Sequence, residues 1–176
     1  MTKSLDLEQG KHRHFIPGEA LPFDVIGRLG SGDYGQVDKI VSKISYRQYA
    51  IKRIRRRTVF GNNTREGMKR FLSEIEIIKS LHHQHVVRYV GSYTDKSFLG
   101  LVMAPVADMD LAGFMEQTCV YIKTASVVND ESAVVNLHYQ VLAAGMCSTL
   151  RTYFGCLTAA LAYIHKRCIR HKGIKP

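Results

Sequence analysis

The sequence has no tryptophan, only four prolines and no apolar run long enough to cross a membrane. The longest candidate, residues 155–164, contains Thr158 and is about half of the roughly 18 to 20 residues that a transmembrane helix needs. The first eight residues carry acidic side chains and lack the hydrophobic segment of a secretory signal. We therefore expect a protein without a membrane partner, located in the cytoplasm or alternatively in the nucleus.

Cysteine is equally sparse. The four cysteines, at positions 119, 147, 156 and 168, form no C-x-x-C pair, so the ligand spacing typical of a zinc site is missing. The histidines at positions 82, 83 and 85 have no second cluster to complete a metal site, and we interpret them as the end of a helix followed by a turn. The sequence therefore predicts no metal centre.

Acidic residues are outnumbered, 15 against 25 basic ones, which gives a net charge of +10. Such a balance favours contact with phosphate, nucleic acid or acidic surfaces. Five of the cations lie within residues 52–57, but no aromatic residues interleave with them as in proteins that stack on nucleic-acid bases. We interpret this run as the end of a strand that enters a solvated basic turn, and nucleic-acid binding remains the alternative.

The 176 residues, 45% of them hydrophobic, suffice for one domain or for a small lobe and part of a second. Residues 1–20 are polar without periodicity, which predicts a flexible tail. Residues 21–57 are typical of three strands, with a turn at 43–47, and residues 86–90 and 99–103 of two more.

Helical periodicity is clearest in residues 67–81, where Met68, Phe71, Leu72, Ile75 and Ile78 repeat at intervals of three and four. Glu74 falls inside this apolar arc, and a carboxylate placed there needs a partner because an unpaired buried charge is costly. Residues 107–117 predict a short helix and residues 149–166 a longer one. Helix and strand signals compete in residues 118–148, which stay unassigned.

A glycine-rich segment carries the first chemical signal. Residues 29–37 read L-G-S-G-D-Y-G-Q-V, which contains the spacing G-x-G-x-x-G. That spacing alone also fits a dinucleotide-binding fold, but there the glycines open a helix, whereas residues 36–41 continue as a strand. A glycine hairpin between strands could lie over phosphate groups and offer them its backbone N–H groups. The alternative is a plain glycine hairpin.

Two further signals follow along the chain. Ala50 and Lys52 lie on the same face of a predicted strand, because side chains alternate. The small residue leaves room for a flat base, and the ammonium group can reach phosphates. Glu74, on the next helix, could form the ion pair that positions Lys52.

Together these features resemble the signature set of protein kinases, in particular the small lobe of a serine/threonine kinase. Residues 71–81 are similar to the regulatory helix of that family, and residues 101–106 to the strand and hinge that hold adenine, with Met103 at the gatekeeper position. Residues 107–111 and 150–164 resemble the start and the first long helix of the large lobe. Residues 37–39 and 91–95 resemble a fungal subgroup.

The resemblance implies an α+β fold, with an antiparallel sheet and one regulatory helix followed by an incomplete helical large lobe. Residues 1–20 would be the tail, residues 21–106 the small lobe and hinge, and residues 107–176 a partial large lobe with 118–148 as an insertion. It also implies a set of ATP-binding residues. These are Leu29, Gly30, Ser31, Gly32, Asp33, Tyr34, Gly35, Val37, Ala50, Lys52, Met103, Ala104 and Val106.

In that family, the lysine contacts the inner phosphates and the glutamate holds it, so Lys52 and Glu74 are the expected catalytic pair. Backbone groups of Ala104 and Val106 would bind the base. The reaction of the family transfers the γ-phosphate of ATP to a serine or threonine of a protein, with magnesium. The expected partners are ATP and a protein substrate or protein partner.

The catalytic loop departs from the family pattern H-R-D-x-x-x-x-N. Residues 171–176 read H-K-G-I-K-P, which puts Gly173 at the position of the catalytic aspartate, and the asparagine and D-F-G that hold magnesium do not follow. Met103 and Gly173 lie 70 residues apart, more than is usual in the family. We therefore expect impaired catalysis, with a pseudokinase binding module as the main alternative and a basic nucleic-acid-binding protein as another.

Overall fold

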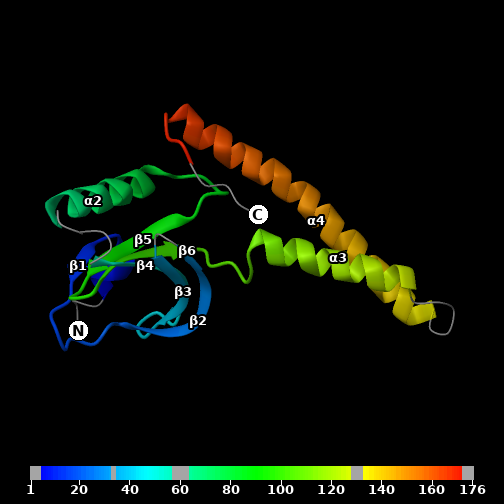
Figure 1. Ribbon diagram of the computed structural model, residues 1–176, viewed down its shortest axis with the longest axis horizontal. Coiled ribbons are helices and arrows are strands. Elements are labelled where there is room, and N and C mark those ends of the chain that lie inside the picture. The colour runs from blue at the N-terminus through cyan, green and yellow to red at the C-terminus, as the bar shows by residue number, and fades with distance from the viewer. Residues whose placement is uncertain (1–4, 33–34, 57–63, 128–132, 172–176) are drawn as a thin grey trace. The chain divides into compact units, whose positions relative to one another are not determined.

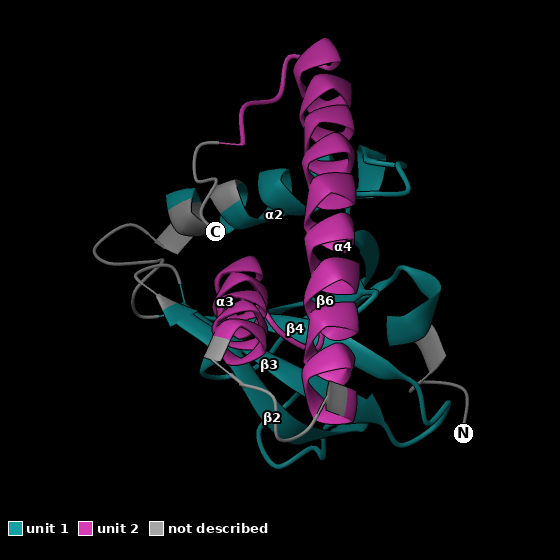
Figure 2. Cartoon of the chain, turned by 90° about the vertical axis from the view of Figure 1, so that its right-hand side faces the viewer, with its two compact units in different colours: residues 1–106 teal, residues 107–176 magenta. Residues whose placement is uncertain are grey.

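The computed structural model describes residues 5–32, 35–56, 64–127 and 133–171. The chain divides into two compact units, residues 1–106 and residues 107–176, which Figure 2 shows in different colours. The first unit contains the sheet, and the second contains two helices.

A six-stranded sheet with the strand order β1-β5-β6-β4-β3-β2 forms the first unit (Figure 1). The strands are β1 (His12–His14), β2 (Phe23–Gly32), β3 (Gly35–Ser42), β4 (Gln48–Arg55), β5 (Arg88–Thr94) and β6 (Phe98–Ala104). All neighbouring strands are antiparallel except β1 and β5, which are parallel. The α+β fold class, with a mostly antiparallel sheet, is confirmed.

Helix α2 (Thr64–Ser80) covers one face of the sheet, which we call the helix face. Phe71 and Ile75 are buried there against Leu99 and Leu101 of β6. The three-four spacing of apolar residues places these side chains on one side of the helix, as the sequence predicts for residues 67–81. The helix begins three residues earlier than expected and ends one residue earlier.

The N-terminal segment covers part of the opposite face, which corrects the expectation of a flexible tail for residues 5–20, while residues 1–4 of that expected tail lie outside the described residues. Residues Leu5–Gln9 form a 3₁₀ helix, η1, and β1 extends the sheet beyond β5. Leu7 and Phe15 are buried with Phe23 and Tyr93, and the Phe15 ring meets the Tyr93 ring edge-on at 5.5 Å between centroids. The segment is ordered because these two apolar side chains fill the opposite face of the sheet.

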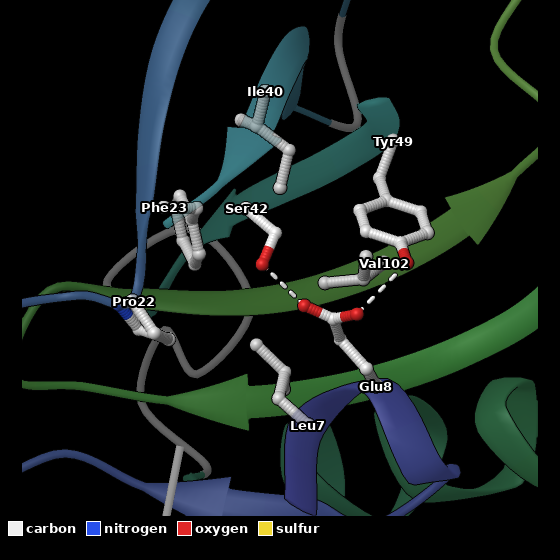
Figure 3. A pocket seen from close by; sticks show the side chains of 8 residues that line it. All are labelled: Leu7, Glu8, Pro22, Phe23, Ile40, Ser42, Tyr49 and Val102. Carbon is white, nitrogen blue, oxygen red and sulfur yellow. Dashed lines mark hydrogen bonds between the residues drawn. The ribbon is translucent and has the colours of Figure 1, made fainter. Parts of the chain in front are cut away.

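A polar contact reinforces this docking. The carboxylate of Glu8 accepts hydrogen bonds from the hydroxyls of Ser42 and Tyr49, the second at 3.0 Å (Figure 3). The three side chains line a cavity of about 10 Å³, which has room for about one water molecule. Burial raises the pKa of Glu8, but the hydrogen bonds from Ser42, Ser45 and Tyr49 and the charge of Arg47 together bring it below its ordinary value.

The second unit consists of helices α3 (Leu111–Val127) and α4 (Ala133–Lys166). They pack side by side in opposite directions, with ring contacts of 5.4 Å between Phe114 and Tyr153 and 6.0 Å between Tyr121 and Tyr139. Neither of these helices, nor α2, is long and apolar enough to span a bilayer.

These two helices correct the sequence-based boundaries. The short helix expected at 107–117 continues to Val127, and the helix expected at 149–166 begins at Ala133, so that residues 118–127 and 133–148 are helical where no assignment was made. The β-branched residues of these segments favour strands as isolated residues. Packing between the two helices overrides that weak preference.

Candidate functional site

A row of directly paired residues crosses four strands at the base of the glycine-rich hairpin. Gly30 of β2 pairs with Val37 of β3, Val37 with Lys52 of β4, and Lys52 with Leu101 of β6. Directly paired residues place their side chains on the same face of a sheet. Because Leu101 packs under α2, Val37 and Lys52 lie on the helix face.

A second row, two residues away, lies on the same face. Ala50 of β4 pairs with Met103 of β6, and both lie two positions from members of the first row. The small Ala50 side chain is buried, and Met103 is half-buried and packs against the apolar cluster under α2. The sequence prediction that Ala50 and Lys52 share a face agrees with this register.

The ammonium group of Lys52 donates a hydrogen bond to Glu74 Oε1 at 2.8 Å. Glu74 reaches the sheet because its neighbour Ile75 and Phe71, one turn earlier, anchor that stretch of α2. The partner that the apolar arc of the helix required for Glu74 is therefore Lys52. The side chains are 27% and 40% exposed, so water screens the pair and it contributes at most about 1 kcal/mol to stability.

Two glycines of the hairpin have distinct geometries. Gly35 has a φ of +125°, and a Cβ atom on it would lie 2.4 Å from the carbonyl oxygen of Arg53, so only glycine fits at this close approach. Within the described part of the chain, no heavy atom lies within 4 Å of the position that a Cβ atom on Gly30 would occupy. The backbone at Gly30 is thus open to a ligand, while that at Gly35 lies against β4.

The remaining predicted residues lie in the same unit where the structure describes them. Leu29 is half-buried at a register shift of β2, Ser31 is exposed, and Gly32 ends that strand. Ala104 ends β6, and Val106 is the last residue of the first unit. Asp33, Tyr34 and Gly173 lie outside the described residues.

One charged residue near the hairpin was not singled out by the sequence. Asp38 of β3 is only 1% exposed, and it receives hydrogen bonds from Gln36 and from Arg53 of β4. The sequence pattern that could have identified Asp38 is the alternation of β3, because Asp38 lies on the same face of the strand as Ile40 and Ser42, which are also buried.

The same contacts bear on the basic run at 52–57. Lys52 is bound to Glu74, Arg53 to Asp38, and Arg56 donates to the carbonyl oxygen of Asp95 at 2.9 Å. Three cations of the run therefore have partners within the first unit.

The helix-face residues fit a nucleotide better than a metal ion. An open glycine backbone, an ammonium group and the small Ala50 beside Met103 are suited to phosphates and to a flat base. Among the described residues, no group of three or more His, Cys, Asp or Glu side chains could hold a metal ion.

Comparisons with known proteins show which family the chain resembles. The family model described as protein kinase domain matches residues 23–176. The chain is 29% identical over 165 residues to the serine/threonine-protein kinase cds1 of Schizosaccharomyces pombe, which covers 93% of this chain and 31% of that protein. It is 28% identical over 155 residues to the serine/threonine-protein kinase ULK3 of Rattus norvegicus, which covers 88% of this chain and 27% of the relative.

A third similarity is confined to a shorter region. The chain is 33% identical over 94 residues to the probable serine/threonine-protein kinase ifkA of Dictyostelium discoideum, which covers 53% of this chain and 4% of that protein. The chain thus spans less than a third of the length of each of these three curated relatives.

Proposed function

This chain belongs to the protein kinase domain family, and from that premise we propose that its first unit binds ATP on the helix face of the sheet. The observation that carries the proposal is the ion pair of Lys52 and Glu74. Lys52 belongs to the row of paired strand residues that begins at Gly30. ATP, when bound, supplies a γ-phosphoryl group for transfer to a serine or threonine hydroxyl of a protein.

Each residue has a part in binding. Lys52 neutralises phosphate charge, and Glu74 keeps the ammonium group on the helix face, because a fixed cation avoids the reorganisation that a mobile one needs. The open backbone at Gly30 offers N–H groups to the phosphates. Val37, Ala50 and Met103 form the apolar surface for the base.

The backbone groups of Ala104 and Val106 complete the proposed set by binding the polar edge of the base. Asp33 and Tyr34 belong to it by their position in the glycine-rich segment. The family uses ATP with magnesium.

Thermal unfolding with and without ATP tests the proposal. We expect ATP to raise the unfolding temperature of the unaltered chain and to raise it much less for Lys52→Met. The matched control is Lys96→Met, which removes an exposed cation from the turn between β5 and β6. Equal shifts for all three proteins would contradict ATP binding through Lys52.

Phosphoryl transfer is a separate question, and we propose that it is impaired by Gly173. Glycine has no side chain to orient or deprotonate a hydroxyl, and positioning is most of what these enzymes contribute. We expect no transfer to a serine/threonine substrate above that of Lys52→Met, which controls for contaminating kinase. Transfer that depends on Lys52 would overturn the proposal.

The second candidate function is a pseudokinase module that acts by binding a protein partner. Gly173 together with an intact pair of Lys52 and Glu74 favours it, because nucleotide binding could persist without catalysis. Nucleic-acid binding is the third candidate, and a steep fall of affinity with salt would identify it.

A further inference from the structure

A buried carboxylate joins three strands at the base of the glycine-rich hairpin. Both oxygens of Asp38 accept hydrogen bonds from Gln36 Nε2, at 2.7 and 2.9 Å. Arg53 donates hydrogen bonds to Oδ2 of Asp38 from Nε, at 3.0 Å, and from Nη2. Nε of Arg28, on β2, lies 3.9 Å from Oδ1 of Asp38. Asp38 is thus in contact with β2, β3 and β4 at once.

The partners of Asp38 are the immediate neighbours of the proposed ATP-binding residues. Gln36 follows Gly35, and Arg53 follows Lys52. Gln36 and Arg53 also pair directly across β3 and β4, one position from the pair of Val37 and Lys52. A rotation of β3 relative to β4 would therefore change the contact between Asp38 and Arg53.

The hairpin needs such a constraint. Glycine is permissive in its backbone angles, so a glycine-rich ribbon can twist over a wide range. A Cβ atom on Gly35 would lie 2.4 Å from the carbonyl oxygen of Arg53, the residue whose side chain Asp38 binds. A charge-assisted arrangement with several directed hydrogen bonds fixes geometry more strictly than apolar packing does.

We propose that Asp38 is a positioning residue, which holds the glycine-rich hairpin at a fixed distance from Lys52 so that its N–H groups are preorganised for phosphates. The inference rests on the proposed ATP binding. It predicts a selective effect, because the side-chain partners of Asp38, Gln36 and Arg53, adjoin Gly35 and Lys52 in the chain, whereas the apolar surface for the base lies on the opposite face of the sheet.

The test compares the binding of ATP and of adenosine by the whole chain, with ligand-observed NMR to register weak binding. We expect Asp38→Asn to weaken ATP binding by about tenfold, the scale of lost preorganisation, and adenosine binding by less than about twofold. Gln36→Met should act in the same direction by about threefold, because it removes one anchor and leaves the pair of Asp38 and Arg53 in place.

Lys43→Met is the matched control. It breaks the exposed ion pair of Lys43 and Asp24, 2.9 Å long, at the other end of the β2–β3 hairpin, and we expect it to leave both affinities unchanged. Thermal unfolding reports whether each variant folds. If Asp38→Asn does not fold, Gln36→Met decides.

The outcomes separate the two proposals. Three outcomes would overturn the role of Asp38 and leave the proposed ATP binding unaffected. The first is an equal loss of ATP and adenosine affinity in the Asp38→Asn or Gln36→Met variant, and the second is no loss of ATP affinity in those of the two variants that fold. The third is a loss of ATP affinity in Lys43→Met as large as in these variants. An unaltered chain that binds neither ligand would overturn the proposed function itself, and the role of Asp38 with it.

Discussion

The carbonyl oxygen of Leu7 lies 1.8 Å from the position that a Cβ atom on Gly91 would occupy. The N-terminal segment therefore lies against the backbone of β5 at this point. Backbone hydrogen bonds on either side, Gly10 N to Val90 O at 2.9 Å and Ser92 N to Lys11 O at 3.3 Å, hold it there. Close contact of the two backbones requires glycine at position 91.

Gly91→Ala should consequently displace the N-terminal segment. We expect it to lower the free energy of unfolding by about 1–3 kcal/mol, the cost of overpacking a close contact. Urea denaturation measures the change.

The control is the same substitution in a chain that lacks residues 1–19. With the contact already absent, Gly91→Ala should change stability by less than about 0.5 kcal/mol, because the two changes act on one interface. Additive effects in the double variant would show that Gly91 is required for another reason.

Two buried tyrosines should respond in opposite ways to the loss of their hydroxyl. Among the residues that the structure describes, the buried Tyr93 OH has no hydrogen-bond partner, whereas Tyr49 OH donates to Glu8. We expect Tyr93→Phe to raise the free energy of unfolding by up to about 1 kcal/mol and Tyr49→Phe to lower it by about 1–2 kcal/mol. Each variant is the control for the other in urea denaturation, and a loss of stability in Tyr93→Phe would reveal a partner for its hydroxyl.

The sequence predicted the parts of the site whose signals are local. The three-four spacing around Ile75 identified α2 and set Glu74 apart as a carboxylate in need of a partner, and strand alternation placed Ala50 and Lys52 on one face. The structure brings Lys52 and Glu74 together at 2.8 Å. Their catalytic role stays a prediction.

The parts that the sequence missed depend on tertiary contacts. Leu7 and Phe15 lie in a largely polar segment without periodicity, and their burial depends on contact with residues of the sheet that are distant in sequence. Asp38 looks like an ordinary polar residue of a strand until Arg53 is placed beside it. Local pattern cannot report contacts between residues that are far apart in the chain.

Stability should fall in two stages on acidification. Burial, followed by the nearby charges of His14 and Lys79, lowers the pKa of His12 below its ordinary 6.5, and the bonds that offset burial lower that of Glu8 below 4.5. In both cases the unfolded chain binds the proton more readily than the folded chain does. The stability that each group contributes to the folded chain is therefore complete at a pH above its ordinary pKa, and it is lost as the pH falls below that pKa.

Urea midpoints between pH 4 and pH 7.5 would register both stages. His12→Gln should flatten the decline just below pH 6.5, and Glu8→Gln the decline just below pH 4.5, because each removes one titrating group. A curve for His12→Gln that runs parallel to the unaltered protein would assign the upper stage to other histidines.

Apolar side chains on α4 should make the 176-residue chain bind a hydrophobic dye. Phe154 is 65% exposed and Leu157 is 42% exposed, although both are large and apolar. Clustered apolar surface of this kind favours association. Phe154→Gln and Leu157→Gln should reduce dye binding, while Arg151→Gln, at an exposed polar position of the same helix, should leave it unchanged. Dye binding that is equal in all variants would place the responsible surface elsewhere.

Glu74 and Glu76 offer a matched pair for separating stability from function. Each forms an ion pair, with Lys52 at 2.8 Å and with Lys79 at 3.1 Å, and the two glutamates are 40% and 71% exposed. Water screens both pairs, so Glu74→Gln and Glu76→Gln should each change the free energy of unfolding by less than about 1 kcal/mol. ATP binding should nevertheless distinguish them.

Only Glu74 fixes the ammonium group that we propose to contact phosphate. Glu74→Gln should therefore weaken ATP binding by about fivefold, the equivalent of about 1 kcal/mol, and Glu76→Gln should leave it unchanged. Titration calorimetry with ATP on both variants measures the difference. If the two substitutions weaken ATP binding equally, the loss does not come from the ion pair of Lys52 and Glu74, because Glu76 pairs with Lys79 instead. A change in net charge alone would strengthen the binding of the ATP anion, because each substitution removes a negative charge. If neither substitution weakens ATP binding, Lys52 holds its position through the packing of its methylene chain, and the ion pair is a consequence of the fold without influence on the nucleotide.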